Sequence, residues 1–170
     1  MFYDIERSCC FTGHRILEEK KIGAIKKALD LEIRWLVSHG ITTFYAGGAI
    51  GFDMLAEQAV IDVRRGNPSV KLYIVIPCHD QDCSFSRADR ERYRYLLDQA
   101  DDSVCLSEHF YSGCMHRRNR YMVDRSGYCI CWLEETDGGT AYTVDYAMKN
   151  DRRIINLALR PPDDNEFDFE

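Results

Sequence analysis

The stretch from Phe44 to Glu57 constrains the fold of this chain more than any other part of its sequence. A short β-rich run ends at the pair Gly47-Gly48, and after Gly51 the apolar residues recur at helical spacing. The stretch therefore predicts a strand, a glycine turn and a helix. Glycines allow positive φ angles and close approach of the backbone, and the new helix directs unpaired N–H groups at the turn. Two interpretations stay open at this point: an anion-binding turn, or a tight connection without a ligand.

Short β-like runs alternate with helical patterns along the whole chain. Strands are expected at residues 7–11, 41–46, 70–76, 102–106, 128–133 and 153–157. Parallel neighbours need crossovers of this length, so the alternation predicts an α/β domain over residues 1–160, with a mainly parallel sheet of about six strands covered on both faces. Residues 161–170 are expected to form an acidic tail. Ligands of such sheets bind beyond the carboxyl ends of the strands, near the point where the strand order reverses.

Composition and charge narrow the classes of function. The 170 residues are 45% hydrophobic, which suits one substantial core. A net charge of −6 disfavours a general electrostatic grip on nucleic acid or on an anionic membrane. The first residues lack the pattern of a signal peptide, and no apolar run approaches the roughly 18 residues of a membrane span. We therefore expect a cytoplasmic protein without a membrane partner.

Eight cysteines in a short secreted chain would suggest disulfides. Here several of them lie inside apolar, strand-like runs: Cys9, Cys10, Cys105, Cys129 and Cys131. Reduced thiols that pack as small hydrophobic side chains fit this pattern better, and they agree with a cytoplasmic location.

A second glycine turn also leads directly into a helix. Gly138 and Gly139 come first, and Thr140 and Thr143 add hydroxyl groups that either cap the helix or bind a phosphate. Neither turn has the Gly-Lys-Ser/Thr ending of a P-loop, and neither has the complete Gly-x-Gly-x-x-Gly dinucleotide pattern. The two turns therefore favour a ligand with phosphate groups and disfavour a triphosphate hydrolase.

Polar side chains elsewhere are placed to face the same crevice. The first strand closes on Thr12, Gly13, His14 and Arg15. In the helix expected at 115–126, Arg118 lies beside the apolar stripe and needs an anionic partner, either a carboxylate or a ligand phosphate, unless it extends to solvent. Asn119 lies within that stripe, so its amide must be hydrogen-bonded by the backbone or by a ligand.

The acid and base candidates are three carboxylates in the first turns of helices: Asp53, Glu57 and Asp145. Capping or pairing with the helix dipole explains Asp53 and Asp145 equally well. The cluster Cys78, His79, Asp80 and Cys83 matches no zinc spacing, so the sequence predicts no metal site, and it names no cofactor.

Four motifs in this order resemble those of the SLOG superfamily, and most closely its YpsA-like branch. They are Thr12-Gly13-His14-Arg15, Gly47-Gly48-Ala49-Ile50-Gly51-Phe52-Asp53, Met115-His116-Arg117-Arg118-Asn119, and Asp137-Gly138-Gly139-Thr140 followed by Tyr142 and Thr143. The match spans roughly residues 9–157. The resemblance implies a doubly wound, Rossmann-like sheet that binds a nucleotide or a nucleotide-derived molecule, often in a homo-oligomer.

A related branch, the Lonely Guy phosphoribohydrolases, cleaves the N-glycosidic bond of nucleoside 5′-monophosphates with an arginine and a glutamate. Arg118 falls on that arginine, but Asn119 replaces the lysine that follows it, and Ala141 replaces the third glycine of the second turn. The nearest acid, Asp145, is displaced by one position and is one methylene shorter. Catalytic carboxylates need close positioning, so these departures favour binding over hydrolysis.

The leading hypothesis is a sensor or sequestering protein that binds a nucleotide-like or ADP-ribose-like small molecule. The expected ligand-binding residues are Thr12, Gly13, His14, Arg15, Gly47, Gly48, Gly51, Asp53, Arg118, Asn119, Gly138, Gly139, Thr140 and Thr143. One alternative is an N-glycosidase in which Arg118 positions the phosphate and Asp145 or Glu57 stabilises the oxocarbenium ion. The other is a non-catalytic structural protein, whose glycine turns would hold no ligand.

Overall fold

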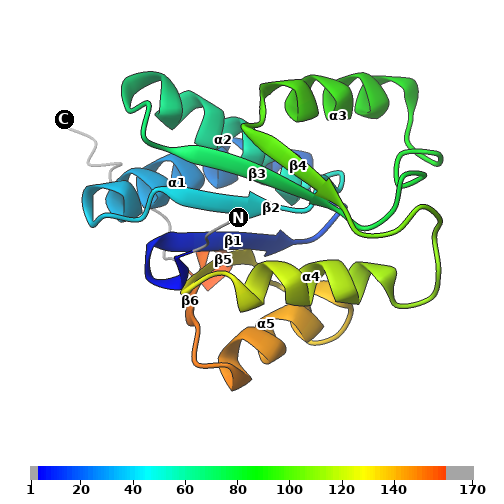
Figure 1. Ribbon diagram of the computed structural model, residues 1–170. Helices are drawn as coiled ribbons and strands as arrows, with labels where there is room; N and C mark the ends of the chain where they lie inside the picture. Colours follow the sequence, from blue (N-terminus) through cyan, green and yellow to red (C-terminus); the bar gives the residue numbers. More distant parts are fainter. Residues whose placement is uncertain (1–3, 160–170) are drawn as a thin grey trace, which may run out of the picture.

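Six parallel strands form one sheet in the computed structural model, which describes residues 4–159 (Figure 1). The strands are β1 (Ser8–Gly13), β2 (Thr43–Ala46), β3 (Lys71–Ile76), β4 (Asp102–Cys105), β5 (Tyr128–Trp132) and β6 (Arg153–Asn156). The helices are α1 (Glu19–Ser38), α2 (Phe52–Gly66), α3 (Arg87–Gln99), α4 (Cys114–Asp124) and α5 (Gly139–Lys149), with short 3₁₀ helices η1 (Ile5–Arg7) and η2 (Leu157–Leu159). The predicted Rossmann-like α/β fold is confirmed. The acidic segment expected at 161–170 lies outside the described residues.

The strand order β4-β3-β2-β1-β5-β6 reverses direction at β1. From β1 the chain builds outward to β4, then returns across the sheet to β5, which pairs with the other side of β1. Because parallel crossovers are right-handed, α1, α2 and α3 cover one face and α4 and α5 cover the other (Figure 1). The carboxyl ends of β1 and β5 therefore border the crevice where ligands of this fold class bind.

The core lies between α1, α2 and the sheet. The helical spacing of α1 buries Ile25, Leu29 and Ile33 completely. On the central strands the rings of Phe11 and Phe44 stack with their centroids 5.9 Å apart. Strands that are covered on both faces have near-continuous apolar sequences, which is why these runs were recognisable.

The first strand extends further than its sequence pattern predicts. Thr12 and Gly13 were expected in the turn after a strand at 7–11, but they continue β1 and pair with Cys131 and Trp132 of β5. The ladder to β5 holds these two residues in the sheet, and no local pattern reveals that pairing. The turn begins at His14 instead, which carries the polar side chains closer to the end of β5.

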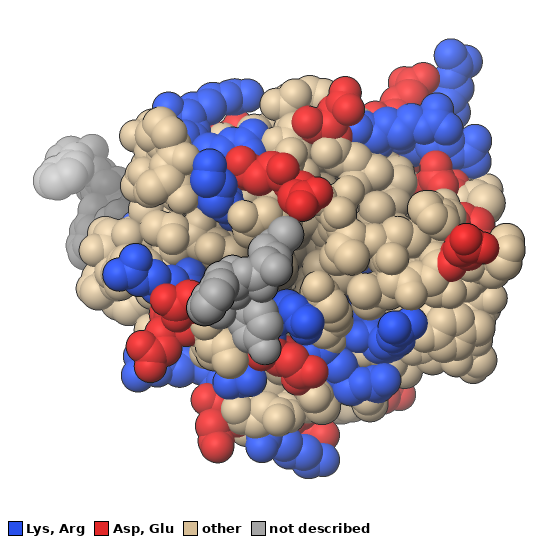
Figure 2. Space-filling model, in the orientation of Figure 1, with Lys and Arg blue, Asp and Glu red and all other residues tan. Residues whose placement is uncertain are grey.

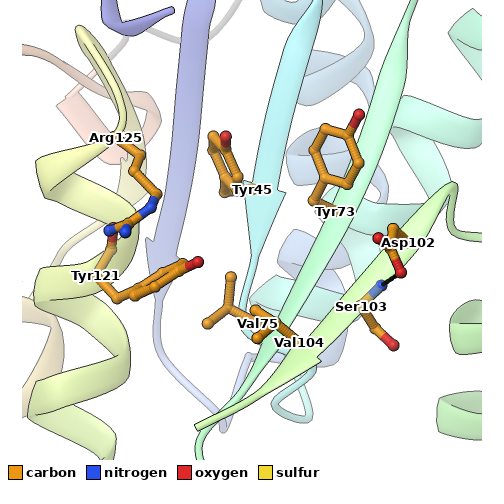
Figure 3. Close-up of a pocket in the computed structure, with 8 residues that line it drawn as sticks. All are labelled: Tyr45, Tyr73, Val75, Asp102, Ser103, Val104, Tyr121 and Arg125. Atoms are coloured by element: carbon orange, nitrogen blue, oxygen red, sulfur yellow. Dashed lines mark hydrogen bonds between the residues drawn. The ribbon is translucent and has the colours of Figure 1, made fainter. Parts of the chain in front are cut away.

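One part of the sheet is left open by α4. Tyr45, Tyr73 and Val104 line a hollow of about 370 Å³ whose far wall is formed by Tyr121 of α4 and by Arg125, the residue that follows this helix (Figure 3). Val104 belongs to β4 at the edge of the sheet and is 39% exposed. This hollow contains none of the residues that the sequence predicts for the functional site.

Charged residues of both signs are interspersed over the face shown in Figure 2, as expected for a chain with 22 basic and 28 acidic residues. Among residues 4–159, no helix is both long enough and apolar enough to cross a membrane.

Two leucines on α1 test this packing. Leu29 is fully buried, whereas Leu31 is 50% exposed on the same helix. We expect Leu29→Ala to lower the free energy of unfolding by about 2–5 kcal/mol because it leaves a cavity in the core. Leu31→Ala should change it by less than about 0.5 kcal/mol. Urea unfolding followed by circular dichroism measures both, and equal losses would contradict the placement of α1.

Candidate functional site

A cavity of about 270 Å³ opens at the carboxyl end of β1, at the point where the strand order reverses. Its walls come from the end of β1, the first turn of α2, one face of α4 and the start of α5. The lining residues are Thr12, Gly13, His14, Arg15, Ala49, Asp53, Met115, His116, Arg118, Asn119, Gly139 and Thr140. Segments that are distant in the sequence therefore converge on one cavity at this edge of the sheet.

Several of the predicted binding residues are not part of the lining of this cavity. They are Gly47, Gly48, Gly51, Gly138 and Thr143. Thr143 is 1% exposed and supports the cavity through hydrogen bonds, whereas Gly138 is an exposed residue at the beginning of α5.

Arg118 connects the two glycine turns through a chain of buried hydrogen bonds. Its Nη1 donates to the carbonyl oxygen of Gly47, and its Nε donates to Asn119 Oδ1 at 2.7 Å. The amide nitrogen Nδ2 of Asn119 donates to Thr143 Oγ1 at 2.8 Å, and that hydroxyl donates to the carbonyl of Gly139 at 2.8 Å. The end of β2, α4 and the first turn of α5 are thus held in register by side chains that are at least nine-tenths buried.

These hydrogen bonds show which groups pair with the polar atoms of Arg118 and Asn119. Both were expected to need either a protein partner or a ligand, and both have protein partners. Arg118 is 4% exposed and Asn119 is 9% exposed, so each presents only a small part of its side chain to the cavity. Their main contribution is to shape the cavity, with the guanidinium of Arg118 adding a positive charge close beneath its surface.

The turn between β2 and α2 is already occupied by the protein's own acidic side chains. The amide of Gly48 donates to Glu57 Oε1 at 2.9 Å, and the amide of Ala49 donates to Asp53 Oδ2 at 3.3 Å. The amide of Phe52 donates to the carbonyl of His14 at 3.1 Å. The amides of Gly48, Ala49 and Phe52 are therefore paired within the protein.

The glycines of this turn are required by contacts with protein atoms. A Cβ at Gly47 would lie 2.6 Å from Arg118 Cζ and 2.8 Å from Asp53 Oδ2. Gly51 has a φ of 79°, and a Cβ there would lie 2.7 Å from the carbonyl oxygen of His14. The absence of side chains thus lets the turn pack against β1 and α4, which the sequence alone does not distinguish from approach to a ligand.

The turn before α5 has the opposite character. A Cβ at Gly138 or Gly139 would meet no atom within 4 Å, so this backbone is open to solvent. Gly138 is the N-cap residue and no side chain caps it, and the first amides of a helix have no partner within the helix. Gly139 and Thr140 line the cavity, so α5 directs unpaired N–H groups toward it.

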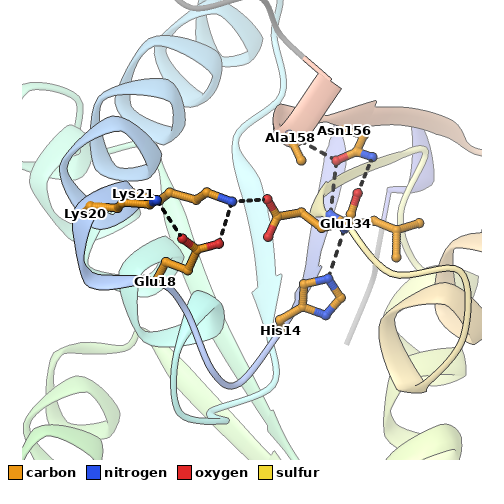
Figure 4. A network of polar contacts seen from close by, with 8 residues as sticks. His14, Glu18, Lys20, Lys21, Glu134, Asn156 and Ala158 are labelled. Atoms are coloured by element: carbon orange, nitrogen blue, oxygen red, sulfur yellow. Dashed lines mark hydrogen bonds and ion pairs between the residues drawn. The ribbon is translucent and has the colours of Figure 1, made fainter.

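His14 connects the ends of β1 and β5 across the crevice. Its Nε2 accepts a hydrogen bond from the amide of Glu134 at 3.0 Å (Figure 4). The carboxylate of Glu134 pairs with Lys21 Nζ at 2.6 Å, and Lys21 also pairs with Glu18. The imidazole therefore stabilises the turn after β1, while its ring still borders the cavity.

Burial shifts the pKa values of the acids under the cavity. Desolvation is the main cause that raises the pKa of Asp53, and the neighbouring Arg118 partly opposes it. Desolvation, followed by repulsion from Asp53, raises the pKa of Glu57 well above its ordinary value of 4.5. Burial therefore makes the ionised form of each acid less favourable than it is in water.

The other two acid candidates are poorly placed to touch a ligand in this cavity. Glu57 is fully buried beneath Gly48. Asp145 lies on the exposed side of α5 and pairs with Lys149 Nζ at 2.8 Å. Asp53 is the carboxylate among the lining residues in the part of the chain that the structure describes.

Three lining residues were not assigned a binding role from the sequence: Ala49, Met115 and His116. Met115 lies three and four positions before Arg118 and Asn119, so helical periodicity placed it on the same face of α4. The His116 ring lies 4.0 Å from the Tyr142 ring of α5, centroid to centroid. That contact depends on the packing of two helices and has no local signal.

The cluster of Cys78, His79, Asp80 and Cys83 does not assemble around a common point. Cys78 is buried, whereas Cys83 is exposed. Within residues 4–159, no three His, Cys, Asp or Glu side chains are grouped so that they could hold a metal ion.

Alanine substitutions in the two glycine turns test their different roles. Gly47→Ala should lower the free energy of unfolding by about 1–3 kcal/mol, because the new methyl group overlaps Arg118. Gly139→Ala should leave stability unchanged within about 0.5 kcal/mol, because its methyl group meets open space. Chemical unfolding of the two variants is the measurement. A destabilised Gly139→Ala variant beside a stable Gly47→Ala variant would contradict the geometry described above.

The raised pKa of Glu57 predicts a dependence of stability on pH. The unfolded state releases this proton near pH 4.5 and the folded state retains it to higher pH, so the free energy of unfolding falls as the pH rises above that value. One such proton accounts for at most about 1.4 kcal/mol per pH unit. Glu57→Gln cannot ionise, so its stability should decline less than that of the wild type between about pH 5 and about pH 8.

Asp53 shifts in the same direction, so part of the decline should persist in Glu57→Gln. Urea unfolding at several pH values gives the two curves. Curves that stay parallel over the whole range would show that Glu57 is ionised in the folded protein.

Comparisons with solved structures identify the same fold in proteins of low sequence identity. DNA processing protein A of Streptococcus pneumoniae superposes with a TM-score of 0.63 at 18% identity, covering 88% of this chain. DNA processing protein A of Helicobacter pylori, described with a single-stranded DNA binding mode, has a TM-score of 0.59 at 18% identity, covering 86% of this chain. This chain spans only 49% and 63% of those two proteins, and the likeness concerns the fold alone.

Similar sequences occur among bacterial proteins of the UPF0398 group. A UPF0398 protein of Halalkalibacterium halodurans is 27% identical over 147 residues, which cover 84% of this chain and 78% of that protein. The UPF0398 protein YpsA of Bacillus subtilis is 24% identical over 135 residues, covering 78% of this chain and 75% of that protein. The model of the YspA SLOG family matches residues 9–159, a span that contains every residue of the cavity. The chain therefore belongs to the YspA SLOG family.

Proposed function

We propose that this protein binds a nucleotide-derived small molecule whose phosphate group lies at the first turn of α5. The observation that carries the proposal is the uncapped start of this helix, which faces a cavity of about 270 Å³. A helix N-terminus attracts anions through its free N–H groups and its dipole. From the resemblance to the SLOG superfamily we expect the ligand to be a nucleotide or an ADP-ribose-like molecule. The protein would then act as a sensor or as a sequestering protein.

Arginines supply the charge that a phosphate needs. Arg15 is exposed and lines the cavity, so its guanidinium is free to contact a ligand directly. Arg118 lies beneath the surface with its hydrogen bonds made to protein atoms, so it acts mainly through its charge. Asp53 also lines the cavity and opposes this charge.

Hydrolysis of a nucleotide has less support. Glu57 is covered by protein, and Asp145 is exposed on α5 and paired with Lys149. An N-glycosidase needs a carboxylate close to the developing oxocarbenium ion. Asp53 remains as the acid nearest to a ligand, so release of free base from a nucleoside monophosphate would have to depend on it.

A small ligand is favoured over single-stranded DNA, although one protein of the same fold is described as binding that polymer. Proteins that bind single strands without sequence preference use a positively charged groove. This chain carries a net charge of −6, and its acidic and basic side chains are mixed over the face in Figure 2. We further infer a cytoplasmic location from the reduced, buried thiols, and the family resemblance leads us to expect a homo-oligomer.

Arg15 provides the test. Binding of AMP, ADP-ribose and ribose 5-phosphate is measured by isothermal titration calorimetry and thermal shift. Arg15→Ala should weaken binding of each ligand roughly ten- to hundredfold, as expected for the loss of a charged hydrogen bond. Arg34→Ala removes another exposed arginine, on α1 and outside the cavity, and should leave affinity unchanged.

Two results would contradict the proposal. One is the absence of binding by all three phosphate compounds to the wild-type protein. The other is equal weakening by Arg15→Ala and Arg34→Ala. Release of free base from AMP would instead support the glycosidase alternative.

A further inference from the structure

A second cavity of about 250 Å³ adjoins the first one. The two share Arg15, Ala49 and Met115 in their linings. The second cavity is otherwise formed by two loops, residues 77–86 after β3 and residues 106–113 after β4, which come together beyond the carboxyl end of the sheet (Figure 1). The two cavities therefore lie side by side, with Arg15, Ala49 and Met115 in common.

The lining of the second cavity differs from that of the first. Phe85 and Phe110 contribute apolar surface to the second cavity alone, whereas Arg118 and the first residues of α5 line the first cavity alone. Phe110 is 62% exposed, so its ring is accessible to a ligand. An aromatic ring at the rim of a ligand cavity is suited to stack on a flat, partly apolar group.

The loop that carries Phe110 is held in place by its backbone and its neighbours. The amide of Phe110 donates to Asp80 Oδ1 at 3.1 Å, and the amide of His79 donates to the carbonyl of Ser107 at 3.2 Å. Arg117 donates from α4 to the carbonyl of Leu106 at 3.1 Å. The exposed ring therefore stands on an ordered backbone, which reduces the entropy that stacking would cost.

The opposite loop is tied to the first site. Gln81 is 7% exposed, and its Nε2 donates to the carbonyls of Gly47 and Gly48 at 3.2 and 2.6 Å. Arg90 of α3 donates to the carbonyl of Asp82 at 3.3 Å. Both walls of the second cavity are thus fixed relative to the glycine turn and to α4.

The two cavities differ in charge, and this difference favours one orientation of a bound ligand. A hydrogen bond from Cys78 is the main cause that lowers the pKa of Asp80, so this carboxylate in the lining of the second cavity is ionised. A negative charge there disfavours a phosphate, whereas Arg118 and the amides of α5, which border the first cavity alone, favour one there. A nucleotide would therefore enter the second cavity with its uncharged end.

We propose that the second cavity is the nucleobase subsite, in which the base stacks on Phe110 while the phosphate lies at α5. The inference rests on the proposed function, because it needs the phosphate of the same ligand in the first cavity. It adds that the protein recognises a nucleotide that retains its base, and it does not apply to a sugar phosphate alone.

The experiment compares AMP with ribose 5-phosphate, which lacks the base. Wild-type protein should bind AMP at least roughly tenfold more tightly by calorimetry, since stacking of a base on an aromatic side chain accounts for roughly a five- to hundredfold change in affinity. Phe110→Ala should reduce the affinity for AMP by that factor and leave the affinity for ribose 5-phosphate within about twofold of wild type. Phe110→Tyr should retain the wild-type preference.

The high exposure of Phe110 makes a folding defect in Phe110→Ala unexpected, and an unchanged melting temperature verifies this. Trp35→Ala is the matched control, because it removes another exposed aromatic, 50% exposed on α1, and should change neither affinity. Equal affinity for AMP and ribose 5-phosphate, or an unchanged preference in Phe110→Ala, would overturn the base subsite and leave the phosphate site intact. Failure of both compounds to bind wild-type protein would overturn the proposed function together with this inference.

Discussion

The buried guanidinium of Arg118 is the interaction on which the site depends. A charged group with 4% exposure is costly unless its hydrogen bonds are satisfied, and here the carbonyl of Gly47 and the side chain of Asn119 satisfy it. Through Asn119 and Thr143 the same network reaches the first turn of α5. The position of the open turn is therefore determined by the packing of α4 against the carboxyl ends of the strands.

The two glycine turns look alike in the sequence, but they have different roles in this structure. In the turn before α2, backbone amides donate hydrogen bonds to Glu57 and Asp53 of the helix that follows. The glycines of this turn leave space for Arg118 and β1. The turn before α5 keeps its amides uncapped and its glycines in open space. A glycine turn at a helix start can thus be a packing device or a ligand site, and the neighbouring carboxylates determine which of the two it becomes.

Much of the fold could be predicted from local pattern, because each strand and helix carries its own periodicity and parallel crossovers admit few topologies. Sequence reasoning expected Arg15 and Gly139 after strand ends and Arg118 beside the apolar stripe of its helix, and all three line one cavity in the structure. Local sequence patterns do not predict features that depend on contacts between distant segments. The extension of β1 to Gly13 depends on pairing with β5, and the exposed ring of Phe110 depends on the hydrogen bond from its amide to Asp80. Neither contact can be predicted from the local sequence.

The central claim is that the α5 turn, and not the α2 turn, is open to an anionic ligand. The most direct measurement is the shift of backbone amide resonances when AMP is added to isotopically labelled protein. The account predicts that the amides of Gly139 and Thr140 shift progressively with ligand, while the amide of Gly48, already bonded to Glu57, stays nearly constant. Shifts centred on the Gly47–Gly51 turn, with the start of α5 unaffected, would contradict it.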